Sequence, residues 1–399
     1  MSLELSKRSM NITPSVTLAI DAKAKEMAAA GEDVIGLGAG EPDFDTPEYI
    51  REAAVVALNK GMTRYTPVGG TLPLRKEICD KLLRENGLSY KPSEIIVSNG
   101  AKHSIYNALY AIIDEGDEVL LPSPCWVSYP EMVAMVGGVP VMVPGAEEDD
   151  FLVDAEALAK YVSPRTKALI LNSPNNPNGC VWPREMLEGI AALAVEKGFH
   201  IISDEIYEKL VYDGRRHVSI ASINEDIKAR TIVVNGVSKA YAMTGWRIGY
   251  AAGPGKVIDA MTSFQSHATS NPNSIAQYAA MEAMKGGEEE IRKMVAEFEA
   301  RRDLMYALVN AIPGLSCRMP EGAFYIMVNI KYTFGKSWNG RVIEGSMDFA
   351  DCLLESQHVA VVPGLPFGAD AHLRLSYAIS REKIERGLAR IAAFVGELK

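Results

Sequence analysis

Two basic residues stand close together in the segment VVNGVSKAYAMTGWRIGYAAG, residues 233–253. Lys239 follows Ser238, and Arg247 comes eight positions later among mostly small or apolar neighbours. Lysine and arginine are rarely buried without a partner. A pair of surface charges is the alternative, but it fits these neighbours poorly. The pattern therefore predicts a site that serves an anion or an electrophile.

Polar residues also follow two apolar strands elsewhere in the chain. In VSNGAKHSIYNAL, residues 97–109, Gly100 and Ala101 open a helix whose free N–H groups suit a phosphate, although an ordinary turn fits as well. In HIISDEIYEKLVY, residues 200–212, Asp204 ends the strand and Tyr207 follows three positions later. Asp204 fits either a buried carboxylate with a cationic partner or a helix N-cap.

Together these groups match the parts of one cofactor, pyridoxal 5′-phosphate. A lysine amine bonds to its aldehyde, and a carboxylate beside the pyridine nitrogen keeps that nitrogen protonated. An arginine, a serine hydroxyl and a helix N-terminus hold the phosphate dianion. The combination predicts a pyridoxal phosphate site around Lys239, Asp204 and Arg247.

A dinucleotide-binding loop is the competing interpretation of VIGLGAGEPDF, residues 34–44. The motif G-x-G-x-x-G counted from Gly36 requires glycine where the chain has Glu41. Pro42 then disfavours a helical backbone at the residue before it. The sequence therefore argues against NAD binding.

Composition and charge argue against several classes of protein. The 399-residue chain has a formal net charge of −10, which argues against a nucleic-acid surface. Its five cysteines contain no C-x-x-C pair, so we expect neither disulfides nor a zinc site, and we expect a cytoplasmic location. The chain has no H-E-x-x-H motif, signal peptide or run of roughly 18 apolar residues, so we expect no metal and no membrane segment.

Short apolar runs alternate with helical patterns over much of the chain. This alternation predicts an α/β fold with a mostly parallel seven-stranded sheet between two helical layers, followed by a smaller α+β unit. We expect an N-terminal segment, 1–45, that joins the small domain, a large cofactor-binding domain, 46–290, and the small C-terminal domain, 291–399. The expected strands are residues 94–98, 118–121, 139–143, 167–171, 200–203, 231–234 and 247–252.

The chain resembles the fold-type I, class I aminotransferases that depend on pyridoxal phosphate, in particular the prokaryotic aspartate aminotransferase branch. The resemblance covers nearly the whole chain, and the motifs occur in the expected order. They are GLGAGEPDF, RYTPVGGTLPLR, NGAKHSIYNAL, SPCWVSYPEMV, NSPNNPNG, SDEIYEKL, NGVSKAYAMTGWRIGY, EGAFY, VVPGLPFG and LRLSYA.

The resemblance implies catalytic roles for Lys239, Asp204 and Tyr207. Lys239 would bond to the cofactor and move the proton from the substrate's Cα, and Asp204 would pair with the ring nitrogen. Tyr207 and Asn176 would hydrogen-bond the ring oxygen, and Trp126 would stack on the ring. The groups implied at the phosphate are the backbone of Gly100 and Ala101, Lys102, Ser238, Arg247 and, from the other subunit of a homodimer, Tyr65.

The resemblance also implies how amino acid and 2-oxo acid substrates bind. Arg374 would clamp the α-carboxylate, assisted by Asn176, Trp126 and the Gly40 backbone. Ser15, Thr17 and Lys102 would hold a distal carboxylate. The implied activity is transfer of the amino group from L-aspartate to 2-oxoglutarate by a ping-pong mechanism. The same branch includes enzymes that transaminate prephenate with much the same pocket, and some that do both, so a prephenate aminotransferase or a bifunctional enzyme is the alternative. Thr13 stands where relatives often carry lysine or arginine, which is a departure from the family pattern.

Simpler interpretations exist for several of these residues and for the whole chain. Trp126 could be core packing, Asn176 a turn residue, Arg374 or Lys102 a solvated side chain, and Tyr65 an interface aromatic. A pyridoxal-phosphate lyase would share the lysine and aspartate. A non-catalytic effector-binding protein on this fold would need a DNA-binding segment, and no segment of the chain is left over for one.

Overall fold

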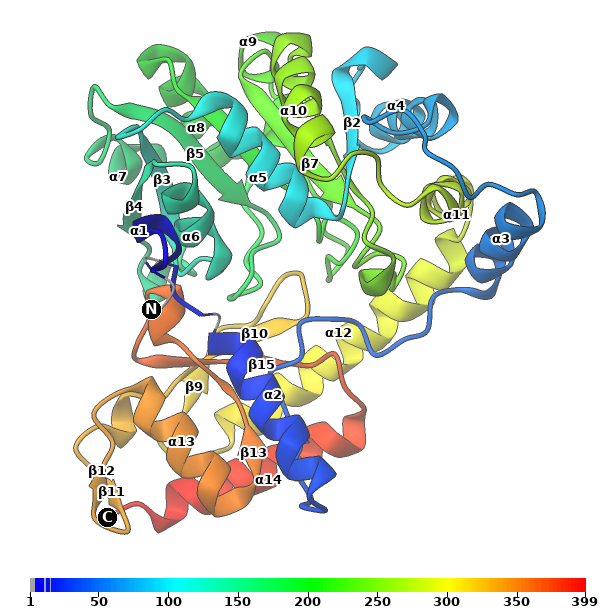
Figure 1. Ribbon diagram of the computed structural model, residues 1–399. Helices are drawn as coiled ribbons and strands as arrows, with labels where there is room; N and C mark the ends of the chain where they lie inside the picture. Colours follow the sequence, from blue (N-terminus) through cyan, green and yellow to red (C-terminus); the bar gives the residue numbers. More distant parts are fainter. Residues whose placement is uncertain (1–3, 11, 15) are drawn as a thin grey trace.

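A seven-stranded sheet is the largest element of the computed structural model, which describes residues 4–10, 12–14 and 16–399 (Figure 1). The strand order is β2-β8-β7-β6-β5-β3-β4, and β8 alone is antiparallel to its neighbours in this sheet. The predicted α/β class is confirmed. The strands are β2 (Ile95–Ser98), β3 (Glu118–Ser123), β4 (Val139–Pro144), β5 (Thr166–Asn172), β6 (His200–Asp204), β7 (Thr231–Gly236) and β8 (Gly249–Ala252).

Helices cover both faces of this sheet. Successive residues of a strand point to opposite sides, so the apolar strands present side chains on both faces. On β6, Ile202 packs in one apolar core and Ile201 in another on the opposite face. The first face is covered by α5 (Ala101–Ile112), α6 (Ser128–Met135) and α10 (Gly255–Ala268). The second face is covered by α3 (Glu48–Asn59), α4 (Leu72–Asn86), α7 (Ala155–Ala159), α8 (Arg184–Lys197), α9 (Glu225–Lys228) and α11 (Ser274–Lys285).

A smaller four-stranded antiparallel sheet, in the order β14-β15-β10-β9, packs against the remaining helices. In Figure 1 the long helix α12 runs from the large sheet's half of the molecule to this smaller part. The elements here are α2 (Val16–Ala29), β1 (Ile35–Gly36), α12 (Glu288–Asn310), β9 (Ser316–Cys317), β10 (Tyr325–Asn329), β11 (Ser337–Trp338), β12 (Arg341–Val342), α13 (Ser346–Gln357), β13 (Val359–Ala360), β14 (Val362–Pro363), β15 (His372–Ser376) and α14 (Arg381–Glu397). Helix α1 (Lys7–Met10) is drawn instead with the large sheet's half of the molecule, near α6 (Figure 1).

The N-terminal segment contacts the small sheet's part of the molecule through β1, which pairs in parallel with β13. The apolar run VAVV, residues 359–362, is divided between two partners, because β13 pairs with β1 and β14 pairs with β15. The division of the chain at residues 45 and 290 stays a prediction.

The strand expected from residue 247 begins later than the sequence pattern indicates. A short 3₁₀ turn, η4 (Thr244–Trp246), ends at Arg247, whose φ of 56° is incompatible with an extended strand. Strand β8 therefore begins at Gly249. The expectation was wrong at this end, and the correction places Arg247 in a turn at the edge of the sheet.

Two further findings bear on the predicted class of protein. Within the described ranges, no helix has both the length and the hydropathy needed to cross a membrane. The cysteines at 79, 125, 180, 317 and 352 are all free thiols.

A buried ion pair joins α4 to the segment after β6. Lys81 Nζ donates to Glu208 Oε1, and the two residues are 2 % and 9 % exposed. Asn86 Nδ2 donates to the other carboxylate oxygen at 2.9 Å. Burial alone would raise the pKa of Glu208, but the charges of Lys81 and His217 outweigh it and lower that pKa to about 2. This pair therefore stabilises the fold at neutral pH.

We predict that Lys81→Met lowers the free energy of unfolding by about 3–5 kcal/mol at pH 7, because it leaves a buried carboxylate unpaired. Since the folded-state pKa of Glu208 is depressed, the contribution is present above the carboxyl's ordinary pKa and is lost as the pH falls toward 2. Urea unfolding at several pH values measures this. The control Lys160→Met, which removes an exposed pair with Glu156, should change stability by less than about 1 kcal/mol. Equal losses in the two variants would contradict the prediction.

Candidate active site

The carboxyl ends of β5 and β6 bring polar side chains to one edge of the sheet, as parallel strands do. Asp204 is the last residue of β6 and is 3 % exposed. Asn172, the last residue of β5, donates from Nδ2 to the backbone carbonyl of Asp204 at 2.9 Å. This contact fixes the strand end that carries the aspartate.

The Asp204 carboxylate is held by two hydrogen bonds from the protein. The hydroxyl of Tyr129 donates to Oδ2 at 2.6 Å, and the N–H of Ile206 donates to Oδ1 at 3.2 Å. Burial raises the pKa of Asp204 to about 6, and these two hydrogen bonds limit the rise. Asp204 is therefore an ionised buried group near neutral pH, suited to pair with a cation such as a protonated ring nitrogen.

Lys239 lies just after β7 and is half-buried. Its Nζ donates to the backbone carbonyl of Gly40 at 2.6 Å and lies 5.9 Å from the centre of the Tyr207 ring. Burial lowers the pKa of Lys239 to about 8; Glu41 opposes this shift and Arg247 adds to it. An amine with such a pKa is partly neutral at physiological pH, so it can act as a nucleophile and as a base.

Arg374 is a buried cation with no carboxylate against it in the described part of the chain. It is 3 % exposed and lies over the Tyr325 ring, 4.4 Å from the ring centre. Its Nη1 donates to Asn176 Oδ1 at 3.0 Å and its Nη2 to the Gly38 carbonyl at 2.9 Å, while Nε has no partner. A buried guanidinium in this state is prepared to bind an anion.

Tyr207 faces the small sheet at this edge. Its hydroxyl lies 3.0 Å from that of Tyr325, and burial raises the pKa of Tyr207 well above its usual value. Tyr207 is therefore a neutral phenol that can donate a hydrogen bond.

The backbone at the start of α5 forms a cradle, and two positions in it have room only for glycine. Gly100 has a φ of 89°, and no side chain caps the helix N-terminus that follows it. A Cβ at Gly100 would lie 2.3 Å from Arg247 Nη2, and one at Gly249 would lie 2.2 Å from the Ala101 nitrogen. The uncapped N–H groups and the adjacent guanidinium fit a phosphate.

Lys102 and Trp126 lie together at the mouth of this cradle. Lys102 Nζ is 4.6 Å from the centre of the Trp126 ring, and burial, then Arg247, lowers the pKa of Lys102. The Trp126 ring stands edge-on to Tyr129, with centres 5.3 Å apart. Trp126 is half-buried.

Four further predicted residues differ in their surroundings. Ser238 is buried beside Lys239. Tyr65 is 92 % exposed in the loop between α3 and α4. Ser15 lies outside the described residues, and Thr17 is placed only as part of α2. An open depression of about 660 Å³ adjoins Arg247 and is lined by Thr46, Asn99, Ala242, Gly245, Trp246, Arg247, Asn273, Ile275 and Ala276.

The sequence reasoning missed three features of this site. Tyr129 follows Trp126 by three positions at the start of α6, a helical spacing that could have indicated a shared face. Tyr325 neighbours Arg374 across β10 and β15, which requires the register to be known. The carbonyls of Gly38 and Gly40 accept hydrogen bonds from Arg374 and Lys239, and no side-chain pattern reveals such acceptors.

Comparison with known proteins gives consistent matches over the whole chain. The family model described as "Aminotransferase class I and II" matches residues 32–391. An aspartate aminotransferase of Geobacillus stearothermophilus is 50% identical over 98% of this chain and 99% of its own. An aspartate/prephenate aminotransferase of Nitrosomonas europaea is 44% identical over 98% of this chain and 100% of its own.

Solved structures agree with these matches. The crystal structure of an aspartate aminotransferase from Rhizobium meliloti superimposes with a TM-score of 0.96 at 44% identity, covering 100% of both chains. An aspartate aminotransferase from Thermus thermophilus, solved with maleate, gives 0.93 at 45% identity over 98% of this chain and 100% of that one. The residues at the sheet edge fit the family's cofactor, pyridoxal 5′-phosphate, in charge and in shape. This chain belongs to the class I and II aminotransferase family and is a pyridoxal-phosphate-dependent transaminase.

Proposed function

We propose that this enzyme transfers the amino group of L-aspartate to 2-oxoglutarate by a ping-pong mechanism. The observation that carries the proposal is the buried guanidinium of Arg374, which lacks a carboxylate partner in the described part of the chain. Relatives that are about half identical over nearly the full length are named aspartate aminotransferases. A dicarboxylate, maleate, is bound in the Thermus thermophilus structure.

The cofactor, when bound, supplies a protonated ring that withdraws electrons from the substrate's Cα. In our proposal the chain holds its phosphate at one end and its ring at the other. The residues that would hold the phosphate are Gly100, Ala101, Lys102, Ser238 and Arg247. The residues that would contact the ring are Trp126, Asn176, Asp204 and Tyr207, and Lys239 would be the covalent anchor.

Lys239 would remove the proton from Cα and return it. Its lowered pKa of about 8 leaves a usable fraction of free amine at neutral pH. The Gly40 carbonyl at 2.6 Å limits where the Nζ can go, so the amine is directed before the substrate arrives.

Asp204 would keep the ring nitrogen protonated, and Tyr129 would keep Asp204 ionised. A hydrogen bond to the charged form of a carboxyl favours that form. Tyr207, neutral and buried, would donate to the ring oxygen together with Asn176. These groups set the protonation of the site without entering the reaction themselves.

Substrate recognition would rest on Arg374, which can take the α-carboxylate in a two-pronged pair. Asn176, Trp126 and the Gly40 backbone would complete that subsite. We propose Ser15, Thr17 and Lys102 for the distal carboxylate. Of these, Lys102 is the one whose side chain the structure describes, held over Trp126.

The quaternary state and location are also part of the proposal. We propose a homodimer in which Tyr65, 92 % exposed in one protomer, contributes to the phosphate site of the other. An aromatic side chain left this exposed is typical of a protein interface. Five free thiols favour the cytoplasm.

Prephenate is the second candidate acceptor, alone or alongside oxaloacetate and 2-oxoglutarate. Several relatives at 44–48% identity carry the name aspartate/prephenate aminotransferase. Thr13, where lysine or arginine is frequent in this branch, leaves the distal subsite without that cation. A larger dicarboxylate would use the same Arg374 subsite.

We predict that L-aspartate alone converts the bound cofactor to its amine form and releases oxaloacetate. A panel of amino donors with 2-oxoglutarate, oxaloacetate and prephenate then measures kcat/KM for each pair. We expect the aspartate and 2-oxoglutarate pair to give the highest kcat/KM. A ratio of more than about tenfold in favour of prephenate, equal to 1.4 kcal/mol of transition-state binding, would transfer the proposal to that acceptor. Release of ammonia with a keto acid would indicate a lyase instead.

We predict that Lys239→Ala reduces transamination by more than about 10³-fold, because it removes both the covalent anchor and the base. Borohydride reduction followed by peptide mapping should attach the cofactor to Lys239 in the wild type. The control Lys102→Ala should still be labelled at Lys239. Labelling that persists in Lys239→Ala would show the assignment to be wrong.

We predict that Tyr129→Phe raises the pKa of Asp204, because the variant loses the hydrogen bond that favours the ionised carboxylate. The acid limb of kcat/KM should therefore move to higher pH by about one unit, so that activity near pH 6 falls several-fold. Tyr110→Phe, a change at an exposed tyrosine on α5, is the control. A pH profile of Tyr129→Phe that overlays the wild type would exclude this role.

A further inference from the structure

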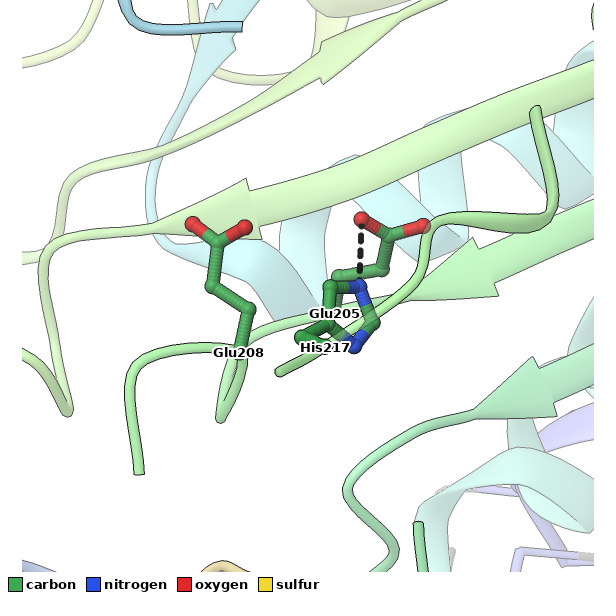
Figure 2. Close-up of side chains that lie close together, drawn as sticks. All are labelled: Glu205, Glu208 and His217. Atoms are coloured by element: carbon green, nitrogen blue, oxygen red, sulfur yellow. Dashed lines mark ion pairs between the residues drawn. The ribbon is translucent and has the colours of Figure 1, made fainter. Parts of the chain in front are cut away.

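A second buried charged cluster lies behind Asp204 and is not used by the proposed mechanism. It consists of Glu205, Glu208 and His217 (Figure 2). One carboxylate oxygen of each glutamate and one ring nitrogen of the histidine lie within 4.8 Å of one another. Glu205 directly follows β6 and lies on the side of Ser203, whose hydroxyl it accepts, whereas Asp204 points to the other side of the strand. Its Oε1 accepts hydrogen bonds from Ser203 at 2.8 Å and Ser219 at 2.6 Å.

Glu205 and His217 form the contact drawn as a dashed line in Figure 2. His217 Nε2 lies 3.1 Å from Glu205 Oε2, and the side chains are 5% and 0% exposed. Neither atom has an aligned hydrogen bond, and His217 Nδ1 has no partner in the described chain. The two side chains therefore lie at ion-pair distance without an aligned hydrogen bond between them.

The charges around the pair favour a proton over a metal ion as the balancing cation. Glu208 is already neutralised by Lys81 and also accepts a hydrogen bond from Asn86. Lys81 also lies 3.6 Å from Glu85, but Glu85 has its own partner in Lys209 at 2.8 Å. With all these groups charged, one surplus negative charge remains, on Glu205. A protonated His217 removes that surplus, whereas a divalent cation would leave a surplus positive charge in a buried place.

We propose that His217 and Glu205 form a buried ion pair that cancels the negative charge behind Asp204, and that this positioning pair helps keep Asp204 ionised. The inference rests on the proposed role of Asp204 as partner of the cofactor's ring nitrogen. In this inference, the loop that carries His217 and Ser219 supplies the positive charge that neutralises Glu205.

The physical reason is repulsion between carboxylates of adjacent residues. Glu205 is among the groups that raise the pKa of Asp204, after burial itself. An unpaired charge at Glu205 would strengthen this effect, because little water is present to screen it. An ion pair with His217 presents Asp204 with a dipole instead of a net charge.

The backbone ties the pair to the strand end. The N–H of Glu205 donates to the Val234 carbonyl at 2.9 Å, while the N–H of Ile206 donates to Asp204. Movement of Glu205 would therefore disturb the strand end and the Ile206 N–H, which donates to the Asp204 carboxylate. The titratable groups that face the cluster are Lys81 and Glu85 on α4, Tyr90 after α4, Asp204 and Glu208 around the end of β6, and Tyr250 on β8.

His217→Gln tests the inference, because glutamine keeps an amide near the position of Nε2 and removes the charge. We expect the dissociation constant of pyridoxal phosphate from the variant apoenzyme to rise about tenfold, with the acid limb of kcat/KM for aspartate about one pH unit higher. The control His358→Gln removes an exposed pair with Glu32 and should alter neither value. Unchanged cofactor affinity and pH profile in His217→Gln would overturn the inference.

Glu205→Gln in the His217→Gln background distinguishes charge from packing. If His217 acts by cancelling the charge of Glu205, the double variant should recover cofactor affinity to within about threefold of the wild type, whereas a purely structural role predicts no recovery. If His217→Gln alone does not fold, the double variant should still fold and bind the cofactor. A double variant that is as impaired as the single one contradicts the proposal.

Two measurements on the wild type separate this inference from others. Aspartate turnover by the wild type establishes the proposed function independently, so failure of the His217→Gln test then rejects the ion pair alone. Metal analysis of the purified enzyme should find no stoichiometric metal. A metal that is present at one per chain in the wild type and lost in Glu205→Gln would replace the proton with a cation and overturn the proposal.

Discussion

The site depends on a carboxylate that is kept ionised inside the protein. Asp204 stands at the end of β6, almost out of contact with water, where burial opposes its charge. Two hydrogen bonds, from Tyr129 and from the Ile206 backbone, counter that opposition. The parallel sheet is what makes this arrangement possible, because the strand end supplies a rigid position and the neighbouring helix α6 supplies the phenol.

Two cations complete the site, the buried Arg374 and the half-buried Lys239, and both are directed by backbone carbonyls of one short segment. Gly40 accepts from Lys239 and Gly38 accepts from Arg374. A carbonyl orients a cation without cancelling its charge, so each remains able to attract an anion or to release a proton. The glycine-rich segment that resembled a dinucleotide loop thus serves in this enzyme as a pair of acceptors. Close approach to Val362, 3.0 Å from a Cβ placed at Gly38, explains the small residue there.

Much of this protein could be predicted from local signals in the sequence. The apolar runs give all seven strands of the large sheet, because buried parallel strands need continuous apolar stretches. Pro47 and Gly87 mark the start of α3 and the end of α4, the latter with a φ of 67°. The polar residues that follow strands, Asp204 and Lys239, stand at the sheet edge as expected, since chain direction alone fixes which end of a parallel strand carries the ligand site.

Interactions between distant segments required the tertiary structure. Tyr129 and Asp204 are 75 positions apart, and Arg374 meets a carbonyl 336 positions before it, so no local spacing reveals either contact. The turn at Arg247 delays the start of β8, because a positive φ is set by the cradle at Gly100 and not by hydropathy. The sequence by itself determined the strands, the chemistry of the side chains and the family. Only the folded chain decided which charges are paired, which are left free and how far each pKa moves, because burial and partner distance exist only after the segments have packed.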